Sequence, residues 1–141
     1  VKAVISYSRG PTLDPYTPQA RFADISVPIL HIAGSRDISW SEPSLPADRL
    51  WAYHKVSAPD QYKLVLKGAD HLTFPGGRAD AGVASAVERR NHQLLQLVSL
   101  AFWEAYLRDD EAAGTWMRNT FPRVLGRAGM FEWKWAAGKR A

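Results

Sequence analysis

Three short apolar runs, rich in β-branched residues, lie in the first half of the chain between stretches broken by Gly and Pro. The runs are Val1 to Tyr7 (VKAVISY), Val27 to Ala33 (VPILHIA) and Tyr62 to Leu66 (YKLVL). Continuous apolar runs of this length are typical of strands buried on both faces of a sheet. The second run ends at Gly34, and the third is followed by Gly68. The pattern therefore predicts three strands of the parallel-sheet type.

The second half of the chain contains one long segment with helical periodicity, from about Ala84 to Leu107. Its apolar stripe consists of Val87, Leu94, Leu95, Val98, Phe102, Ala105 and Tyr106. This spacing predicts an amphipathic helix. Asp109 is a residue type that caps helices, so we expect a second, shorter helix from there to about Met117. The connection between the second and third strands is expected to contain one helical turn near Ala47 to Tyr53.

Strands of the buried type interspersed with helix favour an α/β architecture, with three parallel strands and a long C-terminal packing helix. Three strands alone would leave a long apolar edge unpaired, and natural proteins cover such edges. The chain also begins in strand-like sequence at Val1, without a leading Met or the opening of a signal peptide. We therefore expect residues 1–141 to be the C-terminal portion of a single domain whose upstream half is missing.

Composition narrows the class of protein but leaves the compartment open. Apolar residues make up 46% of the 141 residues and charged residues 23%, which is ordinary for a globular domain. No apolar run approaches the roughly 18 residues that a membrane span needs, so we expect no membrane crossing. The absence of Cys excludes disulfides, Cys-ligated zinc and thiol nucleophiles.

The positive charge is concentrated between Gly114 and Ala141. This segment contains six basic residues and one acidic residue, together with Trp116, Phe121, Phe131, Trp133 and Trp135. Interleaved basic and aromatic residues could bind nucleic acid by stacking and phosphate contacts. Alternatively the rings pack and the charges are solvated, which we favour because no nucleic-acid-binding motif accompanies them. A non-catalytic module that binds nucleic acid through this tail is the main alternative to an enzyme.

Two residues with catalytic chemistry follow the second and third predicted strands. Asp37 stands three positions after Gly34, and His71 stands three positions after Gly68. Reactive side chains collect beyond the carboxyl ends of strands in open parallel sheets, so neighbouring strands would bring these two together. A carboxylate beside an imidazole fixes its tautomer and stabilises its protonated form, as general-base catalysis requires. Either residue alone could be an ordinary turn residue, but their joint placement predicts a catalytic pair.

Three segments together resemble the dienelactone-hydrolase-like esterase group of the α/β-hydrolase superfamily. They are V-P-x-L-x-x-x-G-x-x-D at Val27 to Asp37, G-A-D-H-x-x-F at Gly68 to Phe74, and A-F-W-x-A-Y-L at Ala101 to Leu107. The resemblance covers nearly the whole chain and implies the C-terminal half of an α/β-hydrolase fold. It also implies a serine-type acyl-ester hydrolase, with Asp37 as the triad acid and His71 as the general base. The substrate would be a small-molecule ester, with no cofactor or metal.

The nucleophile that this resemblance requires is missing, since no G-x-S-x-G occurs in the chain. The nearest match is residues 6–10 (SYSRG), where Arg9 is bulky and Pro11 interrupts the helix that should follow at once. We expect Ser8 to end a strand rather than to attack the substrate. The chain would then supply two of the three triad members. It should be inactive alone and need the missing N-terminal half of the same domain as its partner.

The substrate-binding residues are predicted from their position near the catalytic pair. The connection from Ile38 to Asp60 would overhang the pair. Candidates to bound an acyl or alcohol pocket are Tyr7, Trp40, Trp51 and Tyr53. These side chains could equally pack the connection onto the sheet.

The remaining polar residues suggest one further chemistry, a zinc site formed by His31, Asp37 and His71. Neither a His pair at i, i+4 nor an H-E-x-x-H motif supports it, so we do not favour a metal. We expect His31 to be a core or sheet-face residue. Asp70 is expected to hold the histidine loop by hydrogen bonds.

Overall fold

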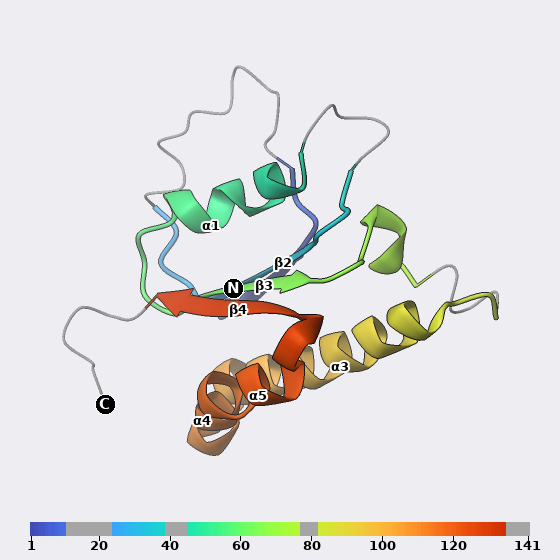
Figure 1. Ribbon diagram of the computed structural model, residues 1–141. Coiled ribbons are helices and arrows are strands. Elements are labelled where there is room, and N and C mark those ends of the chain that lie inside the picture. Colours follow the sequence, from blue (N-terminus) through green and yellow to red (C-terminus); the bar gives the residue numbers. More distant parts are fainter. Residues whose placement is uncertain (11–23, 39–44, 77–81, 135–141) are drawn as a thin grey trace.

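The computed structural model describes residues 1–10, 24–38, 45–76 and 82–134. They form a four-stranded sheet with one short helix on one face and three helices on the other (Figure 1). In the order in which they lie in the sheet, the strands are β1 (Val4–Tyr7), β2 (Ile29–Gly34), β3 (Gln61–Leu66) and β4 (Gly129–Lys134). The architecture is of the α/β class, as the apolar pattern predicted.

The first three strands are parallel neighbours, which confirms the three predicted strands of parallel type. Ser6 of β1 pairs with His31 of β2, and His31 pairs with Lys63 of β3. All six residues of β2 are buried, as expected for a central parallel strand covered on both faces. Because the strands are parallel, the turns that follow them lie along the same edge of the sheet.

The fourth strand was missed by the sequence analysis, which assigned residues 129–134 to a basic aromatic tail. β4 runs antiparallel to β3 and pairs Phe131 with Leu64. Met130 and Glu132 are exposed, whereas Phe131 and Trp133 pack against the core, an alternation typical of a strand with one solvated face. β4 also covers the outer edge of β3. Within the described ranges, the outer edges of β1 and β4 have no strand partner.

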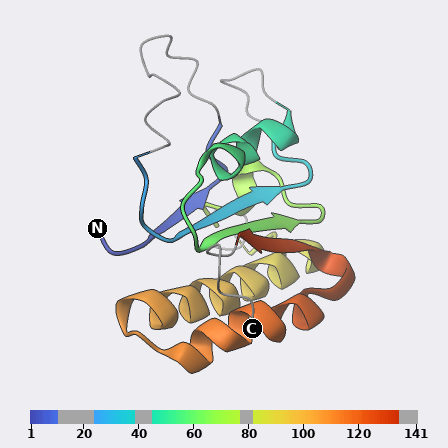
Figure 2. The same ribbon diagram turned by 90° about the vertical axis from the view of Figure 1, so that its left-hand side faces the viewer.

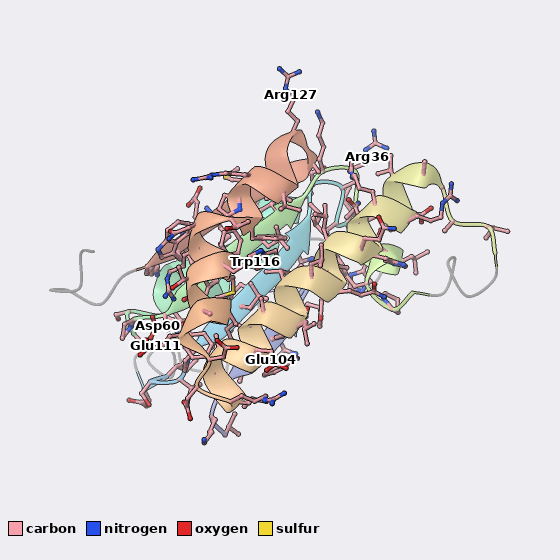
Figure 3. All side chains as sticks on the ribbon, turned by 90° about the horizontal axis from the view of Figure 1, so that it is seen from below. Arg36, Asp60, Glu104, Glu111, Trp116 and Arg127 are labelled. Carbon is pink, nitrogen blue, oxygen red and sulfur yellow. The ribbon has the colours of Figure 1, made fainter. Side chains whose placement is uncertain are left out.

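The aromatic rings of the basic C-terminal segment pack inward, which is the alternative that the sequence favoured. Phe121 is fully buried, and Trp116, Phe131 and Trp133 pack against the core. Seen from below, Trp116 of α4 (Glu111–Asn119) lies on the side of that helix that faces α3 (Ala86–Leu107) (Figure 3). Trp135 lies outside the described residues. These four rings therefore do not form an open stacking surface.

One face of the sheet is covered by a layer of three helices, α3 (Ala86–Leu107), α4 (Glu111–Asn119) and α5 (Phe121–Leu125) (Figure 2). The predicted apolar stripe of α3 is confirmed at four positions that are buried: Leu94, Leu95, Val98 and Phe102. Val87 departs from the stripe and is 41% exposed. It lies in the first turn of α3, close to Gly68.

Helix capping differs from the prediction by one residue. The carboxylate of Asp110, not that of Asp109, accepts hydrogen bonds from the backbone N–H groups of Ala112 and Ala113. Asp109 instead occupies the turn between the helices, with a φ of 56°. The α4 helix therefore begins one residue later than the sequence suggested.

The opposite face of the sheet is covered by a 3-10 turn, Pro46–Leu50, followed by α1 (Trp51–Lys55). These elements confirm the helical turn predicted near residues 47–53. None of the helices in the described ranges is both long enough and apolar enough to span a membrane.

Candidate active site

Three polar side chains from three successive parallel strands meet at one edge of the sheet. Ser8 directly follows β1, Asp37 lies in the turn after β2, and His71 opens the 3-10 turn that follows β3. Ser8 Oγ lies 2.7 Å from Asp37 Oδ1 and 2.7 Å from His71 Nδ1. His71 Nδ1 lies 3.1 Å from Asp37 Oδ1. The predicted carboxylate–imidazole contact is present, and a serine hydroxyl joins it.

Gly34 allows the turn that carries Asp37 to lie close to the loop that carries His71. A Cβ at this position would lie 2.2 Å from the backbone oxygen of Ala69, so any side chain would force the two turns apart. Arg36 N–H donates to that same oxygen at 2.9 Å, and Gly68 N–H donates to Ser35 Oγ at 2.9 Å. The glycine of the G-x-x-D segment is thus required by packing, and it sets the position of Asp37.

The carboxylate of Asp37 is fully buried and is partnered on both oxygens. Oδ1 accepts from Ser8, and Oδ2 accepts from Gly34 N–H at 3.4 Å. The side chain of Arg49 is 2% exposed, and its Nε lies 3.8 Å from Oδ1. Its guanidinium also donates to the backbone oxygens of Ser8, at 3.3 Å, and Asp37, at 3.5 Å. Arg49 therefore supplies the buried positive charge that balances this carboxylate.

The imidazole of His71 presents one nitrogen to the interior and the other toward solvent. Its Nδ1 contacts Ser8 and Asp37, while the side chain as a whole is 42% exposed. Among the described residues, none forms a hydrogen bond with Nε2. This arrangement leaves Nε2 as the nitrogen that can exchange a proton with a substrate.

The loop that carries His71 is held by Asp70, as predicted. The Asp70 carboxylate accepts from Thr73 N–H at 3.0 Å and from the Thr73 hydroxyl at 3.1 Å. His92 Nε2 lies 2.7 Å from Thr73 O, so α3 also contacts the end of this turn. These contacts fix the backbone on both sides of the imidazole.

The four predicted substrate-binding residues are distributed unevenly around this site. Tyr7 is 45% exposed beside Ser8, and its ring centroid is 6.2 Å from that of Phe74 in the histidine loop. Tyr53 is 6% exposed and packs α1 onto the sheet, with its ring 5.7 Å from that of His31. Trp51 lines a cavity of about 310 Å³ beside β1 whose lining includes neither Asp37 nor His71. Trp40 lies outside the described residues.

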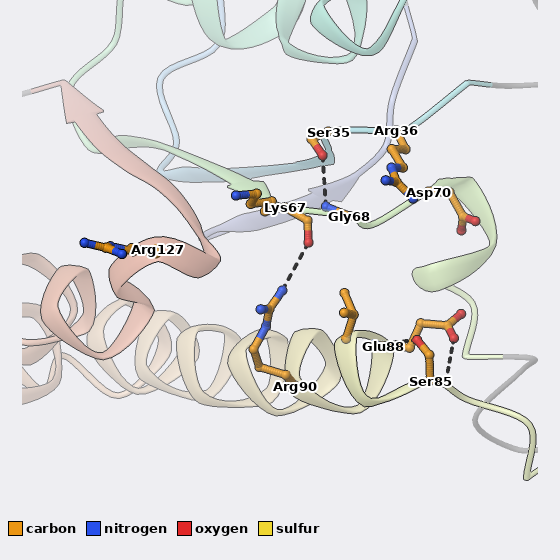
Figure 4. A pocket seen from close by; sticks show the side chains of 10 residues that line it. Ser35, Arg36, Lys67, Gly68, Asp70, Ser85, Glu88, Arg90 and Arg127 are labelled. Carbon is orange, nitrogen blue, oxygen red and sulfur yellow. Dashed lines mark hydrogen bonds between the residues drawn. The ribbon is translucent and has the colours of Figure 1, made fainter.

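A second cavity, of about 610 Å³, lies beside the turns that follow β2 and β3, against the first turns of α3 (Figure 4). Four basic side chains line it: Arg36, Lys67, Arg90 and Arg127. Asp70 and Glu88 also line it, but their carboxylates accept hydrogen bonds from Thr73 and Ser85. Neither Asp37 nor His71 belongs to the lining, so this cavity is separate from the imidazole.

His31 occupies the interior of the sheet, as the sequence predicted. It is 3% exposed, and its Nε2 lies 3.0 Å from Gln61 Oε1. The Gln61 amide nitrogen donates to Val27 O and Pro59 O, so its Oε1 is the acceptor for an Nε2–H of His31. Burial lowers the pKa of His31, chiefly by desolvation. Across the described residues, no group of three or more His, Cys, Asp or Glu side chains could hold a metal ion.

Two members of the site were not assigned these roles from the sequence. Ser8 was considered only as a nucleophile or a strand end, and the register that brings it to Asp37 is not visible in local sequence. Arg49 lies in the 3-10 turn Pro46–Leu50, which is too short for periodicity to distinguish a buried Arg from a solvated one.

Comparison with known proteins adds no relative, since no family model, curated protein or solved structure matches the chain.

Proposed function

We propose that Asp37 and His71 are the acid and the general base of a serine-type acyl-ester hydrolase. The observation that carries this proposal is the buried Asp37 carboxylate on Nδ1 of an imidazole whose other nitrogen has no partner among the described residues. The parallel strands, the two turns and the covering α3 helix fit the C-terminal half of an α/β-hydrolase. We therefore include that fold assignment in the proposal.

The reaction follows from the orientation of the imidazole. His71 Nε2 removes the proton from a serine hydroxyl as its oxygen attacks the ester carbonyl. The alcohol leaves with that proton, which gives an acyl-serine. His71 then removes a proton from water, the resulting hydroxide attacks the acyl group, and the serine regains its proton as the acid is released. Asp37 holds Nδ1 and stabilises the imidazolium at each step.

Ser8 is a poor candidate for the attacking serine, on geometric grounds. Its Oγ contacts Nδ1, on the same side of the ring as Asp37, and the residue is only 6% exposed. Because the chain also contains no G-x-S-x-G, we propose that the serine comes from polypeptide other than these 141 residues. The outer edge of β1, which lacks a partner in the described ranges, is where we propose that the nucleophile strand pairs.

The test uses the polypeptide translated from the whole reading frame that contains these residues. It should hydrolyse p-nitrophenyl acetate, and His71→Ala or Asp37→Asn should lower kcat by about 10⁴-fold. His54→Gln, which changes an exposed histidine on α1, is the matched control and should leave the rate unchanged. Full activity in His71→Ala would refute the proposal, as would a polypeptide that hydrolyses no ester.

A nucleic-acid-binding module remains the alternative from a different class. No observation of the described residues favours it, because the four rings that would stack on bases pack against the core instead. Binding of single-stranded nucleic acid that weakens steeply with salt and depends on Arg123 and Arg127, both exposed, would support it.

A further inference from the structure

We propose that Ser8 is a positioning residue that encloses the Nδ1 proton of His71 and thereby fixes the plane of the imidazole. Its role in catalysis rests on the proposed function, because the orientation of the ring affects a reaction only if His71 is the base. That Ser8 encloses the Nδ1 proton does not depend on the proposed function. The enclosure can be tested on the 141-residue chain alone.

The hydrogen bonds around Ser8 admit one assignment when Asp37 is ionised. A carboxylate can only accept, and the Ser8 hydroxyl carries a single hydrogen, which it donates to Asp37 Oδ1 at 2.7 Å. The contact of 2.7 Å between Ser8 Oγ and His71 Nδ1 then requires the hydrogen to be on Nδ1. Nδ1–H therefore has two acceptors, Ser8 Oγ and Asp37 Oδ1, and in the neutral ring the lone pair lies on Nε2.

The backbone of Ser8 indicates that this placement is specific. Its φ is 49°, in a region of backbone conformation that residues other than Gly rarely adopt. Such a conformation persists when the surroundings over-determine it. Ser8 N–H donates to Ile32 O at 2.7 Å, and Ser8 O accepts from Arg49 at 3.3 Å. Both backbone polar groups of Ser8 are thus hydrogen-bonded, and its hydroxyl contacts Asp37 and His71.

Two acceptors restrain the ring more than one does. With Asp37 alone, Nδ1–H could pivot about a single oxygen 3.1 Å away, and Nε2 would swing with it. With Ser8 present, both neighbours of Nδ1 are fixed, and water is kept from the proton because Ser8 and Asp37 are buried. Ser8 does not face the Nε2 side, so it should influence turnover rather than substrate binding.

The first experiment measures the Nδ1–H proton of His71 by NMR on the ¹⁵N-labelled 141-residue chain, in mildly alkaline buffer. We expect the proton on Nδ1 and slow exchange with water in the native chain. Ser8→Ala and Ser8→Gly should both accelerate exchange by about tenfold or more, since a net hydrogen bond is worth roughly one power of ten. Gly relieves the φ strain and Ala does not, so equal effects identify the hydroxyl as the cause.

The matched control is Ser99→Ala, which removes another serine hydroxyl with a side-chain partner, Tyr7 at 3.1 Å. It should leave the exchange of Nδ1–H unchanged. The inference is overturned if the native proton lies on Nε2, if Ser8→Ala leaves exchange unchanged, or if Ser8→Gly behaves as the native chain does. These outcomes do not depend on esterase activity.

The second experiment uses the polypeptide translated from the whole reading frame. Ser8→Ala should lower kcat for p-nitrophenyl acetate about tenfold and leave KM unchanged, because a lost hydrogen bond to a positioning residue costs about one power of ten. A change confined to KM would overturn the positioning role. Loss of esterase activity in the unsubstituted polypeptide would instead refute the proposed function and leave the NMR result standing.

Discussion

Replacing Arg49 with Met removes the positive charge nearest to the buried carboxylate of Asp37. The Arg49 side chain is 2% exposed and that of Asp37 is fully buried, with Nε 3.8 Å from Oδ1. Met keeps much of the volume of the Arg stem and removes the guanidinium. The variant therefore leaves a carboxylate without its cation in the interior, while the hydrogen bonds from Ser8 and Gly34 remain.

The magnitude follows from the geometry of this pair. At 3.8 Å and an effective dielectric constant of about 20, two unit charges attract by about 4 kcal/mol. Breaking a buried pair by removing one partner typically costs about 3–5 kcal/mol, since the other charge stays desolvated. We therefore expect Arg49→Met and Asp37→Asn each to lower the free energy of unfolding by about 3–5 kcal/mol. The double variant should lose no more than one single variant, because no buried charge is left without its partner.

The assay is urea unfolding followed by far-UV circular dichroism for the native chain, the two single variants and the double variant. Arg108→Met is the matched control, because the Arg108 side chain is 74% exposed and pairs with Glu104 on the surface of α3. It should cost no more than about 0.5 kcal/mol. A loss below about 1 kcal/mol in Arg49→Met, or strict additivity in the double variant, would show that the two charges are not coupled as described.

Three further predictions concern stability. Burial lowers the pKa of His31 below its ordinary 6.5. As the pH falls, His31 is therefore protonated in the unfolded chain before it is protonated in the folded chain. The free energy of unfolding should therefore fall as the pH drops below 6.5, and His31→Gln should flatten this dependence in urea titrations at several pH values. Leu94→Ala should cost about 2–5 kcal/mol in urea unfolding, because Leu94 is 5% exposed, whereas Leu100→Ala, at a site 60% exposed, should stay within about 0.5 kcal/mol. Asp110→Ala should cost about 1 kcal/mol through loss of the α4 cap, while Asp109→Gly should not destabilise the chain, because Gly tolerates a φ of 56°. Equal thermal midpoints for the two Asp variants would contradict that assignment.

The elements that sequence predicted correctly are those whose signal is local. β2 and β3 are short, mostly apolar runs, and α3 carries an apolar stripe of several turns, so each is identified without knowledge of its neighbours. β4 was missed because its signal is a short two-residue alternation with only two inward-facing rings, Phe131 and Trp133, set among basic residues. Its strand character depends on the edge of β3, to which it pairs Phe131. A partner distant in sequence decides such a strand, and no local window contains that partner.

The residues of the site also differ in whether a local signal predicts them. Asp37 and His71 were predicted because each follows a glycine that ends a parallel strand, and the shared edge brings such positions together. Arg49 carries no such signal. Its burial depends on how the 3-10 turn Pro46–Leu50 packs over the strand ends, and on three oxygens contributed by Ser8 and Asp37. A polar residue that acts through contacts made by remote segments becomes visible only when those segments have been placed.

The arrangement of the strand ends also bears on where a nucleophile must lie. The turn after β3 contributes the imidazole of His71. The residues that follow β1 and β2, Ser8 and Asp37, both contact its Nδ1. That side of the ring is therefore occupied by Ser8 and Asp37, so a hydroxyl that exchanges a proton with His71 has only Nε2 left. Under the proposed function, the attacking serine approaches Nε2, whereas the hydroxyl of Ser8 contacts Nδ1. The same contact that makes Ser8 a restraint on the ring thus argues against it as the attacking group.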